Sequence, residues 1–213
     1  MSHSRLGGIG GLTFGILGFV GLLVGNAPGG NYTAADVSSF LAKGHRPAVF
    51  VSAYLVLLSA AGLLLLLSRL RGSLDGAGPR SSLFWGFSVA AATAWMAGYA
   101  IVIGPAVALA FSGGKLTSSA LSGPTVYTFV ESGFGVMYGA GGFFLACALI
   151  AFTVGRVRVP AWVRWATGIA AVTSLAGIAW FPFFLVYLWA VALGVWALAK
   201  DRSAAAQPLG QPV

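Results

Sequence analysis

The sequence has very few charged residues. Only 8% of its 213 residues are charged, whereas 58% are hydrophobic, and an ordinary soluble domain has about 25% charged residues. Too few polar side chains exist to cover a surface in water, which excludes a soluble globular domain. A disordered chain is excluded as well, because it requires low hydrophobicity and high charge. The composition therefore predicts a polytopic membrane protein.

Residues that bind metals or perform catalysis are also scarce. Cys147 is the only cysteine, so an intrachain disulfide is impossible. Two histidines, both outside the apolar segments, and four acidic residues are a poor basis for a metal site. The sequence contains no G-x-S-x-G or H-E-x-x-H motif and no paired carboxylates within an apolar segment, as hydrolases would require. We predict no metal, no cofactor and a function that is not enzymatic.

The excess of basic residues points to membrane orientation. Twelve Lys and Arg against four Asp and Glu give a net charge of +8. Nucleic-acid-binding proteins gather such charge on one face or in tracts, whereas here it lies between apolar segments. We therefore expect the lipid bilayer, and no nucleic acid, as partner.

The chain divides into long apolar segments, which predicts an all-α fold. Each segment reaches or approaches the roughly 20 residues needed to cross a bilayer as a helix, and the alternation typical of a membrane β-barrel is absent. The predicted spans are Leu6–Gly25, Pro47–Leu67, Ser82–Phe111, Thr125–Val154, Ala161–Ala179 and Phe183–Ala199. They make one six-helix transmembrane domain, residues 1–202, followed by a flexible cytoplasmic tail, 203–213.

The basic residues predict which side of the membrane each loop occupies. With a cytoplasmic N-terminus, nine of them lie inside and three outside, as the positive-inside rule requires. Lys200 and Arg202 would lie outside in a five-span protein, so the count favours six spans. We expect a multi-pass protein of the bacterial cell membrane with both termini cytoplasmic. The inside set is Arg5, Arg69, Arg71, Arg80, Arg156, Arg158, Arg164, Lys200 and Arg202, and the outside set is Lys43, Arg46 and Lys115.

The first outer loop has helical features of its own. Thr33 and Asp36 have the spacing of a capping box, and apolar residues follow at helical intervals up to Gly44. We predict a short amphipathic helix here, lying on the outer membrane surface.

Small residues at steps of three and four mark the first and fourth spans. Such residues allow membrane helices to approach closely. Two uses remain open, namely packing within one bundle and the interface of a homo-oligomer. The candidate packing residues are Gly7, Gly11, Gly15, Gly18, Gly135, Gly139 and Gly142.

Glu131 is the only acidic residue within an apolar segment. Carboxylates in membranes often couple protons or bind cations. However, Glu131 is 21 residues from Phe152 at the inner boundary, or roughly 31 Å along a helix. This depth also fits a hydrated interfacial carboxylate, paired with Arg46 or Lys115.

Polar aromatic residues gather in the outer half of the predicted bundle. The same count of helical rise places Tyr138, Tyr99 and Tyr54 there. We hypothesise a polar-aromatic cavity in the outer half that opens beneath the amphipathic helix. The alternative is that these side chains only hydrogen-bond between helices.

Two basic residues precede the second span. His45 and Arg46, directly before Pro47, are candidates for binding a lipid phosphate or another anion. Residues of this kind also simply anchor helix ends among the head groups.

The order of these features resembles a family of uncharacterised six-helix integral membrane proteins of bacteria. The resemblance is carried by the Gly-rich first span, the segment Ala-Ala-Asp-Val-Ser-Ser-Phe-Leu-Ala-Lys-Gly-His-Arg at 34–46 and Val-Pro-Ala-Trp-Val-Arg-Trp at 159–165. It implies a six-helix fold and no particular activity.

The sequence thus favours an accessory or structural membrane component that holds a lipid or a small apolar ligand in its outer half. A membrane-protein partner or a second copy of the chain would assemble with it. Two alternatives remain, a small secondary transporter that uses Glu131 and a lipid-processing enzyme.

Overall fold

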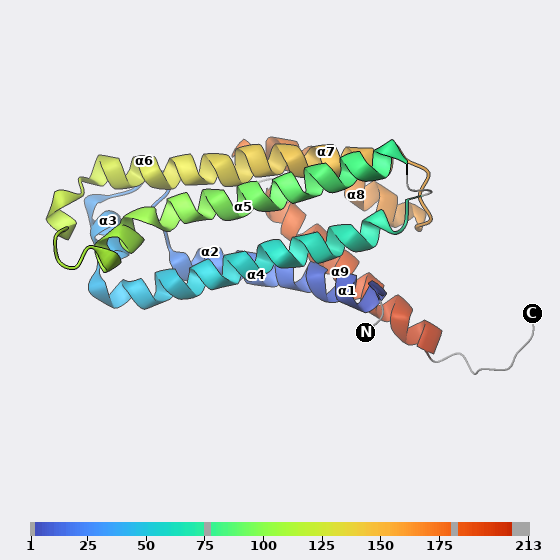
Figure 1. The fold of residues 1–213 in the computed structure, drawn as a ribbon, viewed down its shortest axis with the longest axis horizontal. Helices are drawn as coiled ribbons and strands as arrows, with labels where there is room; N and C mark the ends of the chain where they lie inside the picture. The colour runs from blue at the N-terminus through green and yellow to red at the C-terminus, as the bar shows by residue number, and fades with distance from the viewer. Residues whose placement is uncertain (1–2, 75–77, 180–182, 206–213) are drawn as a thin grey trace, which may run out of the picture.

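The computed structural model describes residues 3–74, 78–179 and 183–205 (Figure 1). Most of them are helical, which confirms the predicted all-α fold. The one β-bridge in this part of the chain joins Leu74 to Val157. The elements are α1 (His3–Leu12), η1 (Thr13–Leu17), α2 (Gly18–Gly25), α3 (Ala34–Leu41), η2 (Lys43–His45), α4 (Arg46–Arg71), α5 (Pro79–Phe111), η3 (Ser118–Ala120), α6 (Gly123–Phe134), η4 (Gly135–Ala140), α7 (Gly141–Thr153), α8 (Ala161–Leu175), η5 (Ala176–Ala179) and α9 (Phe184–Ala205).

Long apolar helices dominate the fold. Among the described residues, four helices are long and apolar enough to cross a membrane, namely Arg5–Gly25, Lys43–Arg71, Pro79–Phe111 and Gly123–Thr153. The apolar helix Phe184–Lys200 is shorter, and α8 has 15 residues. The helices end where the sequence changes character, at Arg71 before Gly72 and at Thr153 before the 154–160 loop. Most of the predicted tail, residues 206–213, lies outside the described residues.

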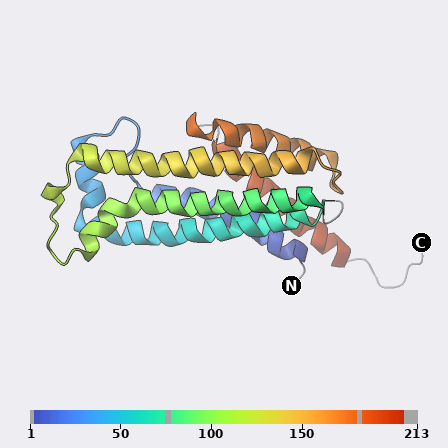
Figure 2. The same ribbon diagram turned by 45° about the horizontal axis from the view of Figure 1, so that its top comes forward.

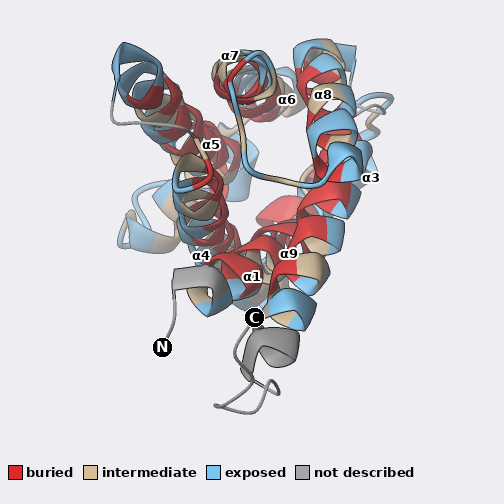
Figure 3. Ribbon diagram, turned by 90° about the vertical axis from the view of Figure 1, so that its right-hand side faces the viewer, coloured by how far each residue is buried: buried red, intermediate tan, exposed pale blue. Residues whose placement is uncertain are grey.

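The helices form a closed ring in chain order. The unit α1–η1–α2 contacts α4, α4 contacts α5, α5 contacts α6 and α7, α7 contacts α8, α8 contacts α9, and α9 returns to α1. Figure 3, which looks along the bundle, shows the buried faces turned toward a common centre. This arrangement places one apolar face of every helix inward.

The bundle has two different ends. We call the end where α1 begins and α9 finishes the terminal end, and the end that carries α3 and the 112–123 connection the α3 end (Figure 1). The α8–α9 hairpin lies beside only the part of the bundle nearest the terminal end (Figure 2). The α3 half is closed instead by α3 and the loop 26–33.

Aromatic side chains fill the centre of the ring. The Trp95 side chain is 1% exposed, and its ring lies 5.0 Å from that of Phe183, 5.5 Å from Tyr138 and 5.6 Å from Phe14. Phe14 and Tyr138 lie in η1 and η4, which are π-helical interruptions of their spans. Such interruptions widen a turn and often mark functional positions.

Two glycine pairs bring helices into backbone contact. A Cβ on Gly10 would lie 2.6 Å from the carbonyl oxygen of Gly62, and a Cβ on Gly98 would lie 2.6 Å from that of Gly133. Since no side chain fits at these crossings, α1 packs directly on α4 and α5 directly on α6. Close approach of this kind maximises van der Waals contact between helices.

Candidate functional site

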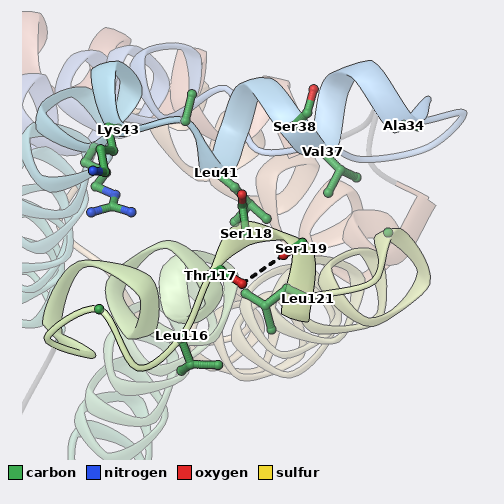
Figure 4. A pocket seen from close by; sticks show the side chains of 14 residues that line it. Ala34, Val37, Ser38, Leu41, Lys43, Leu116, Thr117, Ser118, Ser119 and Leu121 are labelled. Atoms are coloured by element: carbon green, nitrogen blue, oxygen red, sulfur yellow. Dashed lines mark hydrogen bonds between the residues drawn. The ribbon is translucent and has the colours of Figure 1, made fainter.

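A groove of about 620 Å³ lies at the α3 end, between α3 and the 112–123 connection (Figure 4). Its volume is in the range of small-ligand sites. It combines two cations, a group of hydroxyls and several aliphatic side chains. The lining residues are Lys43 and Arg46, then Ser38, Thr117, Ser118 and Ser119, then Ala34, Val37, Leu41, Ala42, Leu116 and Leu121, and the glycines Gly114 and Gly123.

The roof of this groove is α3, and the sequence explains its position. The Asp36 backbone N–H donates to the Thr33 hydroxyl oxygen at 3.2 Å, and the Thr33 backbone N–H donates to the Asp36 carboxylate at 2.6 Å. The predicted helix and its capping box are therefore confirmed. Hydrogen bonds from the Thr33 backbone and then its side chain lower the pKa of Asp36. The apolar residues Val37, Phe40 and Leu41 are buried against the bundle.

The groove is electrostatically positive. None of its lining residues is acidic. Lys43 is exposed, and the Arg46 Nε atom is buried without a hydrogen-bond partner among the described residues. Asp36 instead lines a smaller pocket of about 270 Å³ beside the loop 26–33. The two sides of α3 therefore differ in charge, and the larger cavity favours an anion.

The Glu131 side chain on α6 hydrogen-bonds to the loop 26–33. Its Oε1 atom accepts a hydrogen bond from the Gly30 backbone N–H at 3.0 Å. One turn earlier on α6, Tyr127 stacks on Tyr32 with ring centroids 4.1 Å apart. These two contacts hold the loop 26–33 across the bundle. The carboxylate therefore contacts a backbone N–H of this loop, where the sequence had suggested Arg46 or Lys115 as partner.

The three candidate tyrosines do not share one cavity. The Tyr99 hydroxyl donates to the Ser52 hydroxyl at 2.7 Å, and Tyr138 lies among the central aromatic rings. The Tyr54 side chain is 69% exposed and lies on the outside of α4. Tyr99 and Tyr138 thus face the interior, and none of the three tyrosines lines the groove that lies beneath α3.

His45 and Arg46 have different surroundings. The His45 Nε2 atom hydrogen-bonds to the Gly25 carbonyl oxygen at 3.0 Å; because a carbonyl can only accept, Nε2 carries the proton. This bond ties the end of α2 to the start of α4. Arg46 lines the groove. Of the two head-group candidates, Arg46 is the one that a bound anion would meet.

The candidate glycines lie mostly between helices of the same chain. A Cβ on Gly11 or Gly15 would meet the backbone of α9, one on Gly7 or Gly18 would meet α4 side chains, and one on Gly142 would meet the Ser174 carbonyl. Gly135 is exposed, with nothing within 4 Å of a Cβ placed there, and Gly139 is half-buried.

The sequence interpretation missed several residues that the structure brings together. The hydroxyl residues Thr117, Ser118 and Ser119 were assigned no role, although a hydroxyl run close to a lysine is a recognisable feature of anion sites. Gly98 and Gly133 were also missed as a packing pair. Alanines at 91 and 94 precede Gly98 at steps of three and four, so this small-residue face was detectable.

No protein-family model, no curated protein and no solved structure matches the chain. A function for it therefore has to be argued from its own residues.

Proposed function

We propose that the protein is a six-span integral membrane component without enzymatic activity, and that it holds a lipid or another amphiphile at its α3 end. The observation that carries this proposal is the groove beneath α3, where cations, hydroxyls and aliphatic side chains line one cavity. The lining offers polar contacts to a head group and apolar contacts to a chain. The lining contains no histidine, cysteine, aspartate or glutamate, and this favours binding over catalysis.

Helix lengths support six spans. The α8–η5 segment, Ala161–Ala179, rises by roughly 30 Å, and Phe184–Lys200 by roughly 26 Å. Both are close to the roughly 30 Å of the hydrocarbon core. The 33 residues of α5 rise by about 50 Å. In a six-span arrangement α5 and α6 therefore extend beyond the bilayer at the α3 end and carry the groove to its surface.

Charge supports the orientation. Nine basic residues of the described segments lie at the terminal end and three at the α3 end, Lys43, Arg46 and Lys115. The positive-inside rule then makes the terminal end, with both termini, cytoplasmic. The α3 end faces outward, and the cell membrane of a bacterium is the proposed location.

Cysteine labelling of the α8–α9 tip tests the number of spans. Four-span and six-span arrangements both place the termini on one side, so the tip is the informative position. In a Cys147→Ser background, Ala179→Cys is expected to react in intact cells with a membrane-impermeant maleimide, as Ser119→Cys does. Arg156→Cys is expected to react only after the cells are opened. An Ala179→Cys variant that stays unlabelled in intact cells while Ser119→Cys reacts contradicts six spans.

A small secondary transporter is the second candidate. The π-helical segments η1 and η4 favour it, because they interrupt two spans of opposite direction and both contact Trp95. Broken helices that meet at a central position are typical of transporters. Glu131 would be the coupling residue, so Glu131→Gln is expected to abolish transport in a folded protein if this candidate holds. The Gly30–Glu131 bond favours instead a structural role for this carboxylate.

A further inference from the structure

We propose that the groove beneath α3 is a specific site for an anionic amphiphile, whose phosphate or carboxylate head group is bound by Arg46 and Lys43. The proposal names the ligand class for the site on which the proposed function rests. Three independent features of the groove support it: its two cationic side chains, its hydroxyl floor and its aliphatic walls.

The first feature is Arg46. Its Nε atom is buried without a hydrogen-bond partner in the described part of the chain, and a buried polar group left unpaired is costly. The planar guanidinium presents donors in a fork that matches phosphate or carboxylate oxygens. Lys43 lines the same groove three residues earlier. An anion between these two side chains would neutralise both charges.

The second feature is the hydroxyl floor. Thr117, Ser118 and Ser119 come from one turn of the 112–123 connection, opposite α3 (Figure 4). The Thr117 and Ser119 hydroxyls lie 2.8 Å apart and hydrogen-bond to each other, which orients both. Hydroxyls donate to anion oxygens without adding charge. They favour an oxygen-rich head group over a simple halide.

The third feature is the apolar lining. Val37 and Leu41 on α3 face Leu116 and Leu121 on the other wall (Figure 4). A small inorganic ion would leave most of a cavity of about 620 Å³ unfilled. Burial of methylene groups is favourable. The cavity therefore suits a head group that carries an apolar chain.

The site lies where α4 begins, so an amphiphile can reach it from the adjacent bilayer surface or from solution. Both sources share the same chemistry, and three probes separate them. Dihexanoyl phosphatidic acid carries anion and chain, dihexanoyl phosphatidylcholine carries the chain with a zwitterionic head group, and inorganic phosphate carries the anion alone. Each is titrated by calorimetry, below its micelle concentration, into the full-length protein in a non-ionic detergent.

We expect phosphatidic acid to bind at least about tenfold more tightly than either other probe, because only this probe satisfies all three features. Arg46→Gln and Lys43→Gln are each expected to weaken that binding at least about tenfold. Lys115→Gln is the matched control, since it removes the same charge from the 112–123 connection, where Lys115 is exposed and does not line the groove. It is expected to change affinity less than about threefold, because salt screens an exposed charge outside the groove.

Equal affinity for phosphatidylcholine, or equal losses in Arg46→Gln and Lys115→Gln, would overturn the proposal. If inorganic phosphate binds as tightly as phosphatidic acid, the ligand is a free anion and the assignment to an amphiphile is overturned. Lys43 is exposed, so Lys43→Gln keeps the test decisive if Arg46→Gln does not fold. Because these titrations need no bilayer, their failure is distinguishable from failure of the six-span arrangement, which the labelling of Ala179→Cys tests.

For the bilayer as source, the purified protein is reconstituted in vesicles of phosphatidylcholine that contain phosphatidic acid and is extracted again in a non-ionic detergent, and the lipid retained by the protein is identified by mass spectrometry. Enriched phosphatidic acid that Arg46→Gln no longer retains identifies a membrane lipid as occupant. Phosphatidic acid retained only in its proportion in the vesicles, with soluble phosphatidic acid still bound, assigns the site to an amphiphile from solution and overturns the bilayer as its source.

Discussion

The contact between α5 and α6 gives the sharpest test of the packing. A Cβ on Gly98 would lie 2.5 Å from the Met137 backbone nitrogen and 2.6 Å from the Gly133 carbonyl oxygen. An ordinary contact needs at least 3.4 Å, so Gly98→Ala has to move the two helices apart by roughly 0.9 Å, the difference between 3.4 and 2.5 Å. Both neighbours are backbone atoms, which cannot rotate away as a side chain would.

The packing cost of Gly98→Ala can be separated from the effect of helix propensity. Replacing Gly by Ala favours a helix by up to about 1 kcal/mol, and overpacking typically costs about 1–3 kcal/mol. Gly86, on the same helix, has nothing within 4 Å of a Cβ placed there. The difference between Gly98→Ala and Gly86→Ala therefore isolates packing, and we expect it to be about 1–3 kcal/mol. This corresponds to roughly 5- to 150-fold in the unfolding equilibrium.

The assay is equilibrium unfolding in mixed micelles with an increasing fraction of dodecyl sulfate, followed by tryptophan fluorescence. Gly133→Ala approaches the same crossing from the other helix, where its Cβ would lie 2.6 Å from the Gly98 carbonyl oxygen, and is expected to behave alike. If Gly98→Ala is as stable as Gly86→Ala to within about 0.5 kcal/mol, the close crossing of α5 and α6 is refuted.

Three further predictions concern hydrogen bonds. Tyr99→Phe is expected to destabilise the protein by about 0.5–1.5 kcal/mol, while Tyr54→Phe at an exposed position is expected to be neutral; similar unfolding curves for the two would contradict the buried bond to Ser52. Glu131→Ala is expected to speed hydrogen exchange at the Gly30 amide, because it removes the acceptor. Glu131→Gln keeps an acceptor oxygen and is expected to speed this exchange less, so equal exchange rates in the two variants would argue against the bond. The folded-state pKa of Asp36 is lowered from its ordinary value of 3.8, so its support of α3 is complete above that value and is lost as the pH falls through the lowered one. Exchange of α3 amides, measured between pH 7 and 3 and corrected for intrinsic rates, is expected to rise only at the acidic end, and protection that is constant throughout would speak against this cap.

The elements of this fold were largely predictable because their causes are local. An apolar run of helical length in a bilayer forms a helix because its backbone groups have to bond within the segment, and the predicted spans overlap described helices. The α3 cap was predictable for the same reason, since Thr33 and Asp36 are three residues apart and bond to each other. The π-helical segments were not predicted, because they depend on which ring packs beside Phe14 and Tyr138.

The candidate residues were harder to interpret because their partners are distant in sequence. Glu131 accepts from a backbone group 101 residues away, and a single sequence carries no signal for a bond to a main-chain N–H. Tyr54 and Tyr99 have comparable predicted depths in the bilayer, yet one is exposed and the other buried. Depth follows from counting residues, whereas the direction of a side chain depends on how its helix is rotated against its neighbours.

The sequence by itself determined the all-α fold, its helices and the uneven distribution of charge, because hydrophobic length and local capping act within a few residues. Only the tertiary structure decided that the α8–α9 hairpin lies beside the part of the bundle nearest the terminal end and that α3 lies over the 112–123 connection. The groove between them joins Lys43 and Arg46 to hydroxyls more than 70 residues further along the chain. Such a site exists only once packing has brought the two segments together, and for this reason the composition that indicated a membrane protein could not indicate what it binds.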